Sequence, residues 1–215
     1  MSKYKHIIWD WNGTLLNDLQ LTVSAMNQVL LKRSMPYLSE DHYLDIFTFP
    51  VIDYYKRLGF DFEKEPFTIS GSEFIDRYNK RAEEAVLHDD ALTTLNTFRD
   101  YGMTQSILSA SRQDYLDDLI THHQIRDYFI KVLGIDNHYA DGKIDIGKAW
   151  MDELHYGPHE VLFIGDTLHD LEVADAIGAD CALVAIGHKS RSRLKKGHPH
   201  IFSSLTELKN YLFSN

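Results

Sequence analysis

Residues 6–16 decide the fold, and they read His-Ile-Ile-Trp-Asp-Trp-Asn-Gly-Thr-Leu-Leu. The first part, His6–Trp9, is a short apolar run of the length expected for a buried β-strand. The next part, Asp10–Thr14, is mostly polar and includes Asn-Gly, a dipeptide common in turns. Ligands of open parallel sheets bind beyond the carboxyl ends of the strands. A strand that ends in a carboxylate and a turn is therefore a candidate for such a binding edge.

Further short apolar runs follow along the chain, next to segments with apolar residues three and four positions apart. The predicted strands after the first are Gln105–Leu108, Phe129–Leu133, Val161–Ile164 and Ala182–Ile186. The predicted helices beside them cover residues 91–101, 113–122, 146–155 and 168–177. Strands that alternate with helices in this way form a parallel sheet covered by helices. We therefore predict an α/β fold with a doubly wound parallel sheet.

Residues 15–87 interrupt this alternation, because they show helical periodicity and no second strand. We expect four short helices in this segment. The predicted division is a core domain of residues 1–16 and 88–215, with a helical cap domain of residues 17–87 inserted after the first strand.

Composition excludes several kinds of partner. The 215-residue chain has 22 Lys and Arg against 32 Asp and Glu, a formal net charge of −10. This charge repels nucleic-acid backbones, so we expect no nucleic-acid partner. The single cysteine, Cys181, cannot form an internal disulfide and fits a reducing, cytoplasmic location. No apolar run approaches the ~18 residues that a membrane-spanning helix needs, so we expect no membrane partner.

Polar side chains follow three of the predicted strands. The three segments are Asp10–Thr14, Ser109–Ser111 and Gly165–Asp170. The carboxyl ends of parallel strands meet at one edge, so Asp10, Asp166 and Asp170 should converge there. Three carboxylates brought together repel one another, and one of them would stay protonated unless a cation neutralised the group. Mg²⁺, a hard ion that prefers oxygen ligands, is the cofactor we expect.

These motifs, in this order and over nearly the whole chain, resemble those of the haloacid-dehalogenase-like hydrolase superfamily. Its members carry Asp-x-Asp-Gly-Thr, a Ser or Thr, a Lys and Gly-Asp-x-x-x-Asp. The helical insertion is similar to the cap of the phosphoglycolate-phosphatase-like branch. The resemblance implies a Mg²⁺-dependent phosphatase that acts on a small phosphorylated metabolite. It also implies an aspartyl-phosphate intermediate on the nucleophile Asp10, followed by release of phosphate to water.

The resemblance also assigns ligands. The metal ligands it implies are the Asp10 carboxylate, the Asn12 backbone carbonyl and Asp166, with Asp170 close by. The phosphate-binding residues it implies are Thr14, Ser109, Ala110 and Lys143. Lys143 is favoured over Lys148 as the catalytic cation, because the lysine of this family precedes its helix.

Asn12 is a departure from the family pattern, since a second Asp normally stands there and acts as general acid and base. An amide can do neither at neutral pH, and this help is typically worth ~10²–10⁴ in rate. We therefore expect an impaired enzyme, or one restricted to substrates with a good leaving group, such as an acyl phosphate. The backbone carbonyl of Asn12 remains available to a metal.

Two other functions fit the same residues. The chain could be a non-catalytic relative that binds phosphorylated metabolites or a protein. It could also be a C–P hydrolase similar to phosphonoacetaldehyde hydrolases, in which this position is not Asp and a cap lysine forms a Schiff base. The lysines of the predicted cap lie in no motif that matches that enzyme; they are Lys32, Lys56, Lys64 and Lys80.

Overall fold

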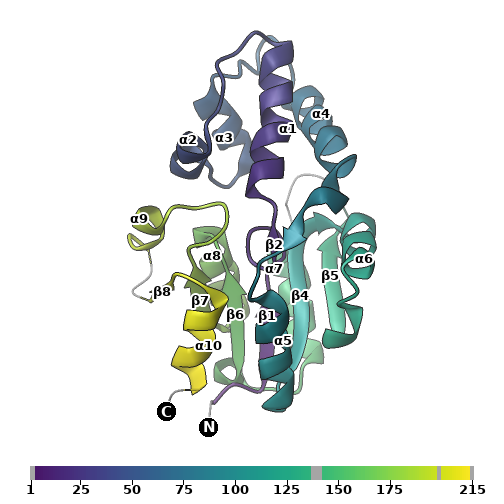
Figure 1. Cartoon of the computed structure of the whole chain (residues 1–215), viewed down its shortest axis with the longest axis vertical. Coiled ribbons are helices and arrows are strands. Elements are labelled where there is room, and N and C mark those ends of the chain that lie inside the picture. Colours follow the sequence, from purple (N-terminus) through teal and green to yellow (C-terminus); the bar gives the residue numbers. More distant parts are fainter. Residues whose placement is uncertain (1–2, 137–141, 198–199, 214–215) are drawn as a thin grey trace.

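A six-stranded parallel sheet forms the centre of the molecule (Figure 1). The computed structural model describes residues 3–136, 142–197 and 200–213. Strand order is β5-β4-β1-β6-β7-β8, and every neighbouring pair is parallel. The strands are β1 (His6–Trp9), β4 (Thr104–Arg112), β5 (Lys131–Ile135), β6 (Val161–Gly165), β7 (Asp180–Val184) and β8 (Ile201–Phe202). The predicted doubly wound parallel sheet is confirmed.

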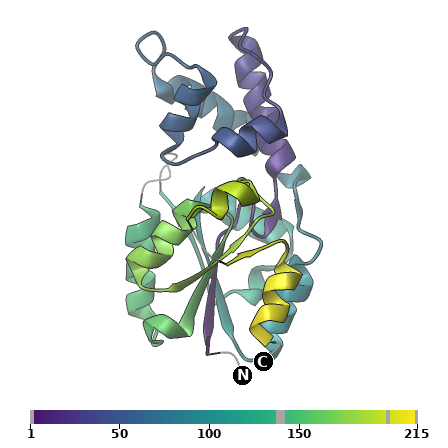
Figure 2. The same ribbon diagram turned by 90° about the vertical axis from the view of Figure 1, so that its left-hand side faces the viewer.

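Helices cover both faces of this sheet (Figure 2). They are α5 (Ala91–Asp100), α6 (Gln113–His122), α7 (Lys143–Glu153), α8 (Leu168–Ile177) and α10 (Leu205–Phe213). Successive side chains of a strand point to opposite faces of the sheet. The apolar side chains of β1 therefore pack against the helices on both faces. Ile7 and Trp9 pack in one buried cluster with α5, α6 and α10, whereas Ile8 packs in another with α7 and α8.

Several elements differ from the sequence-based expectation, including β5, β7 and α7, whose bounds are shifted by two or three residues. β4 continues to Arg112 instead of ending at Leu108, and its pairing with β5 shifts register between these two residues. Irregular pairing of this kind is common beside active sites. β8, a two-residue strand at Ile201–Phe202, was not predicted because its apolar run is shorter than any reliable strand pattern. The short α9 (Arg191–Leu194) lies between β7 and β8.

Four helices lie between β2 (Leu16–Asn17) and β3 (Val86–Leu87), which pair antiparallel. They are α1 (Leu19–Lys32), α2 (Glu40–Ile46), α3 (Val51–Leu58) and α4 (Phe67–Asn79). We call residues 18–85 the helical insertion. Its helices bury an apolar cluster of their own and stand beyond the carboxyl ends of the strands (Figure 1). Within the described ranges, no helix has the length and apolar character to cross a membrane.

Candidate active site

A cavity of about 250 Å³ lies between the carboxyl edge of the sheet and the helical insertion. Three acidic side chains from the sheet edge line it: Asp10, Asp166 and Asp170. Asp10 follows β1, and its backbone N–H donates to the Ile164 carbonyl of β6 over 2.9 Å. This pairing brings Asp10 beside Asp166, which directly follows β6. One oxygen from each of the three buried carboxylates lies within 4.8 Å of the others.

Lys143 is the cation of this cluster. It is the first residue of α7, which Gly142 precedes in a left-handed conformation, so the helix starts earlier than predicted. The Lys143 side chain is 2% exposed, and its Nζ donates to Asp10 Oδ1 over 2.7 Å and to Asp170 Oδ1 over 2.8 Å. Lys148 is exposed on the same helix. The geometry therefore favours Lys143 over Lys148.

The charges of the three carboxylates and the Lys143 ammonium do not cancel. Burial raises the pKa of Asp10 and of Asp166, and neighbouring carboxylates add to the effect. Burial opposes ionisation of Asp170 as well, but the Lys143 ammonium and the Thr167 hydrogen bonds hold the pKa of Asp170 below its usual value. With all three carboxylates ionised, one ammonium would leave an excess of two negative charges. A donor set of oxygens with this excess fits a hard divalent cation such as Mg²⁺.

Asp170 differs from the other two carboxylates because donors within 2.9 Å occupy both of its oxygens, whereas Asp10 and Asp166 each have such a donor on one oxygen only, Lys143 on Asp10 Oδ1 and the His188 backbone N–H on Asp166 Oδ2. Oδ1 binds Lys143, and Oδ2 accepts from the Thr167 backbone N–H over 2.9 Å and from its hydroxyl over 2.7 Å. These contacts form a capping box at the start of α8. A side chain at Gly165 would come within 2.4 Å of Asp170, so glycine is required there. Asp170 thus holds the Lys143 ammonium in place, whereas Asp10 and Asp166 each keep one oxygen without a donor within 2.9 Å.

The residues predicted to bind phosphate do not all line the cavity. Ser109 and Ala110 line the cavity. Thr14 is fully buried, is not among the lining residues, and its hydroxyl lies 3.4 Å from both Asp10 Oδ2 and Asp166 Oδ1. The structure therefore brings Thr14 to the carboxylates and not to the cavity wall.

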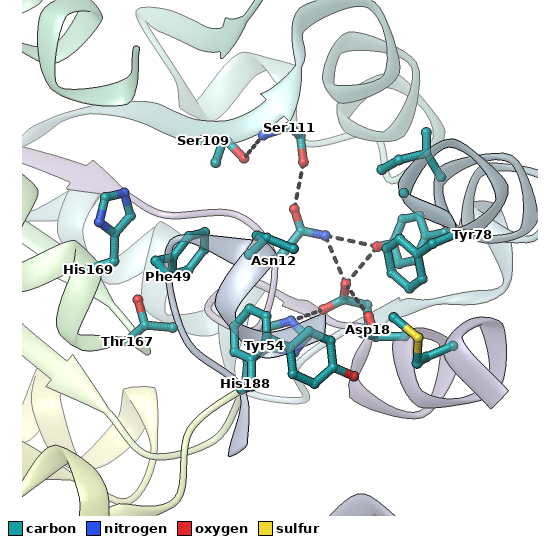
Figure 3. A pocket seen from close by; sticks show the side chains of 18 of the residues that line it. Asn12, Asp18, Phe49, Tyr54, Tyr78, Ser109, Ser111, Thr167, His169 and His188 are labelled. Atoms are coloured by element: carbon teal, nitrogen blue, oxygen red, sulfur yellow. Dashed lines mark hydrogen bonds and ion pairs between the residues drawn. The ribbon is translucent and has the colours of Figure 1, made fainter. Parts of the chain in front are cut away.

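Protein partners occupy the side chain of Asn12 completely (Figure 3). Its Oδ1 accepts from the Ser111 hydroxyl over 2.7 Å. Its Nδ2 donates to Asp18 Oδ2 and to the Tyr78 hydroxyl, each over 2.8 Å. The amide therefore connects β4 to the helical insertion. It has no acidic proton to give to a substrate.

Ser111 has a residue type common at helix N-caps but does not cap the helix that follows β4. β4 continues through Arg112, which pairs with Ile135, and α6 begins only at Gln113. The cap residue of α6 is Arg112, which makes no side-chain cap hydrogen bond. The Ser111 hydroxyl binds Asn12 instead.

Sequence reasoning missed a buried ion pair between Asp18 and His188. Asp18 opens the helical insertion, and its Oδ1 accepts from the Gly13 backbone N–H and lies 3.0 Å from His188 Nε2. His188 Nδ1 lies 3.0 Å from the Tyr43 hydroxyl of α2. Burial alone would lower the pKa of His188, but the Asp18 carboxylate raises it to about 9. No sequence signal joins two residues this far apart, because only tertiary folding brings them together.

Comparison with known proteins agrees with this geometry. A family model described as "Haloacid dehalogenase-like hydrolase" matches residues 7–184. The chain belongs to this family. It is 22% identical over 215 residues to a protein named phosphoglycolate phosphatase from Vibrio parahaemolyticus, covering 95% of this chain and 94% of that protein. A corresponding protein from Vibrio vulnificus is 23% identical over 214 residues, with the same coverage.

Solved structures share the fold of this hydrolase. The crystal structure of a predicted phosphatase from Clostridium acetobutylicum superposes with a TM-score of 0.82 at 20% identity, covering 99% of both chains. At this identity the likeness establishes the fold alone. Because the superposition covers 99% of both chains, it includes the helical insertion as well as the sheet.

The ion pair between Asp18 and His188 makes the stability of this hydrolase depend on pH. The folded-state pKa of His188 is raised from 6.5 to about 9. The contribution of the ion pair to the free energy of unfolding is therefore complete below pH 6.5 and is lost as pH rises through 9. We expect the stability difference between wild type and His188→Gln to shrink by about 3 kcal/mol from pH 6 to pH 9.5. Urea unfolding in EDTA measures this difference.

His159→Gln is the control for that measurement, since the His159 side chain is 84% exposed. It should show no comparable change between the two pH values. A His188→Gln difference that stays constant with pH would show that the imidazole is not ionised in the folded protein.

Proposed function

We propose that this hydrolase is a Mg²⁺-dependent phosphatase that transfers the phosphoryl group of a small phosphorylated metabolite first to Asp10 and then to water. The observation that carries the proposal is the buried cluster of Asp10, Asp166 and Lys143 at the carboxyl edge of the sheet. The relatives named phosphoglycolate phosphatase support the reaction class. The single Cys181 is consistent with a reducing compartment, and we place the enzyme in the cytoplasm.

Each residue of the cluster has a role in this mechanism. Mg²⁺, when bound by the Asp10 and Asp166 carboxylates and the Asn12 backbone carbonyl, would neutralise negative charge on the phosphate. The Lys143 ammonium offsets the charge of Asp10 and of the incoming phosphate. Asp10 attacks phosphorus, which splits one difficult displacement into two easier ones. Ser109 and the Ala110 backbone are proposed to hold phosphate oxygens, with Thr14 fixing the carboxylates behind them.

The helical insertion is proposed to act as a cap over this reaction. We assign residues 17–87 to the cap and residues 1–16 and 88–215 to the core. Contacts between the two support a closed arrangement: Arg193 donates to the backbone carbonyls of Leu44 and Phe47 over 2.9 and 2.7 Å. Closure excludes water from the aspartyl phosphate and adds contacts to the substrate.

Mg²⁺ should stabilise the protein, and more strongly at pH 8 than at pH 5. Burial and neighbouring carboxylates raise the pKa of Asp10 to about 6 and of Asp166 to about 8, so the metal-free folded state binds protons that the unfolded chain has released. Its stability therefore falls as pH rises from 4 to 8, and a cation that replaces these protons restores it. Saturating Mg²⁺ should raise the Tm by roughly 5 °C at pH 8 and much less at pH 5.

Two variants control this measurement by differential scanning fluorimetry. Asp166→Asn should abolish the shift, whereas Asp175→Asn, an exposed position on α8, should preserve it. A shift of equal size at both pH values, or one that survives Asp166→Asn, would place the metal elsewhere.

A phosphatase assay separates the proposed function from the two alternatives. With p-nitrophenyl phosphate, we expect turnover that requires Mg²⁺ and stops in EDTA. A purely binding protein predicts no metal-dependent turnover. The C–P hydrolase alternative needs a free lysine at the substrate, but of the described lysines only Lys143 lines the cavity, and it is ion-paired.

A further inference from the structure

The side of the cavity that the helical insertion forms is largely apolar and aromatic, although Asp18, Thr22, Ser72 and Asn79 also line it. The helical insertion contributes these half-buried side chains to it: Phe47, Phe49, Val51, Phe67, Phe74 and Ile75. Phe49 stacks on His169 of the core with ring centroids 4.5 Å apart, and the Phe47 and Phe49 rings are 5.4 Å apart. Figure 3 shows Phe49, His169 and Tyr54 around the cavity beside Asn12. A flat apolar group fits between walls of this kind.

No cation among the described lining residues of the cavity is free to receive a second negative charge. Among the described residues that line the cavity, the insertion supplies no Lys or Arg. The core supplies Lys143, Arg112 and the His188 imidazolium, and each is ion-paired: Lys143 to Asp10 and Asp170, Arg112 to Asp114, and His188 to Asp18. A carboxylate buried here would lose its hydration and meet neutral donors such as the Tyr54 hydroxyl but no unpaired cation of the described residues, which is unfavourable.

Buried polar atoms without partners indicate a polar group on the ligand: among the described residues that line the cavity these atoms are the Tyr54 hydroxyl, Asn79 Nδ2 and His169 Nε2. The Tyr54 side chain is 2% exposed and lines the cavity, and within the described residues its hydroxyl has no hydrogen-bond partner. Buried hydroxyl groups are normally satisfied. A hydroxyl or amide group on a bound ring would give the Tyr54 hydroxyl a hydrogen-bond partner. An aromatic wall would have no function in a cavity that held only water.

Asn12 independently limits which leaving groups can depart from the phosphate. Its amide is held by Ser111, Asp18 and Tyr78 and cannot protonate a departing oxygen. The leaving group must then depart as an anion. A phenol ionises near pKa 10, about six units below water, so a phenolate departs far more readily than an alkoxide.

We infer that the substrate is a monophosphate ester of a single-ring phenol, an aryl phosphate without a second anionic group. This inference rests on the proposed function and names its substrate class. An Asp10 oxygen bonds to phosphorus while the bond between phosphorus and the aryl oxygen breaks, and the electron pair leaves with that oxygen as phenolate. Water then attacks the phosphorus of the aspartyl phosphate and frees the Asp10 carboxylate, and the proton that the water loses passes through solvent to the phenolate. The net products are the phenol and inorganic phosphate.

The inference has two parts, an aromatic ring on the substrate and a good leaving group. Assays of the Mg²⁺-loaded wild-type enzyme with three substrates test them separately: phenyl phosphate, 2-phenylethyl phosphate and phosphoglycolate. We expect kcat/KM for phenyl phosphate to exceed that for phosphoglycolate by at least about 100-fold. The phenylethyl ester, with a ring but a poor leaving group, should lie between them, at least tenfold above phosphoglycolate. Phosphoglycolate hydrolysed as well as or better than the phenylethyl ester would overturn the inference while leaving the phosphatase intact. Hydrolysis of none of the three would overturn the proposed function as well.

A matched pair of variants on α4 tests the wall itself. Ile75→Lys places an ammonium in the cavity at a position outside the buried apolar clusters. It should raise kcat/KM for phosphoglycolate relative to phenyl phosphate by about tenfold or more. Ile69→Lys makes the same change at a residue that is 46% exposed and does not line the cavity, and it should leave the ratio unchanged. An unchanged ratio in a folded Ile75→Lys protein would contradict the assignment of this wall to the leaving group.

Discussion

Asp10→Asn should lower kcat for p-nitrophenyl phosphate by about 10⁴-fold or more, because loss of a covalent nucleophile is among the largest single-residue effects on turnover. The substitution keeps the size of the side chain but removes the charge that Lys143 binds over 2.7 Å. The amide oxygen is also a poorer nucleophile and a poorer metal ligand. Initial rates under saturating Mg²⁺ measure the loss.

Asp170→Asn is the matched control, since Asp170 binds the same lysine but has both oxygens occupied by protein donors. It should reduce activity by about 10- to 100-fold, the usual effect of removing a group that orients a ligand. If the two variants lost activity equally, or Asp10→Asn kept most of it, Asp10 would not be the nucleophile.

Asn12→Asp should raise kcat for alkyl phosphates by about 10²–10⁴-fold, the usual worth of a general acid and base. Asn12 Nδ2 lies 2.8 Å from Asp18 Oδ2, so the new carboxyl would face an existing carboxylate. Two carboxyls at this distance share a proton, which raises the pKa of one of them. Position 12 would then hold a proton near neutral pH and could give it to an alkoxide.

The measurement is a comparison of two esters with different leaving groups. The gain should be large for the phenylethyl ester and small for p-nitrophenyl phosphate, whose leaving group needs no proton. Asn17→Asp makes the same charge change at an exposed residue of β2 and should alter neither rate. Mass spectrometry of the wild type verifies that Asn12 has not deamidated. Equal gains for both esters, or none, would show that protonation does not limit the reaction.

Sequence reasoning located the sheet and its acidic edge because both depend on local patterns. Short apolar runs set the strands, and the polar residues that follow a strand must lie at its carboxyl end. The closeness of Asp10 to Asp166 then follows from the parallel pairing of β1 with β6. Lys143 was favoured by its place before a helix, and α7 does start with it.

The parts that could not be predicted depend on how the helical insertion closes over the sheet. The contact between Asp18 and His188 spans 170 positions, and the insertion also brings Tyr78 to Asn12. Ser111 has the residue type of a helix cap, and only the register shift in β4 turns its hydroxyl to Asn12. Aromatic residues in the insertion were equally compatible with a small core. The structure shows which of them line the cavity.

Mass spectrometry of the acid-quenched enzyme tests the central claim most directly. The wild-type protein is mixed with Mg²⁺ and excess p-nitrophenyl phosphate, quenched during turnover, and digested. We predict one added phosphoryl group on the peptide that contains residues 6–16, located at Asp10 and absent when EDTA replaces Mg²⁺. A phosphoryl group on any other residue, or on Asp10 to the same extent in EDTA, would contradict the account.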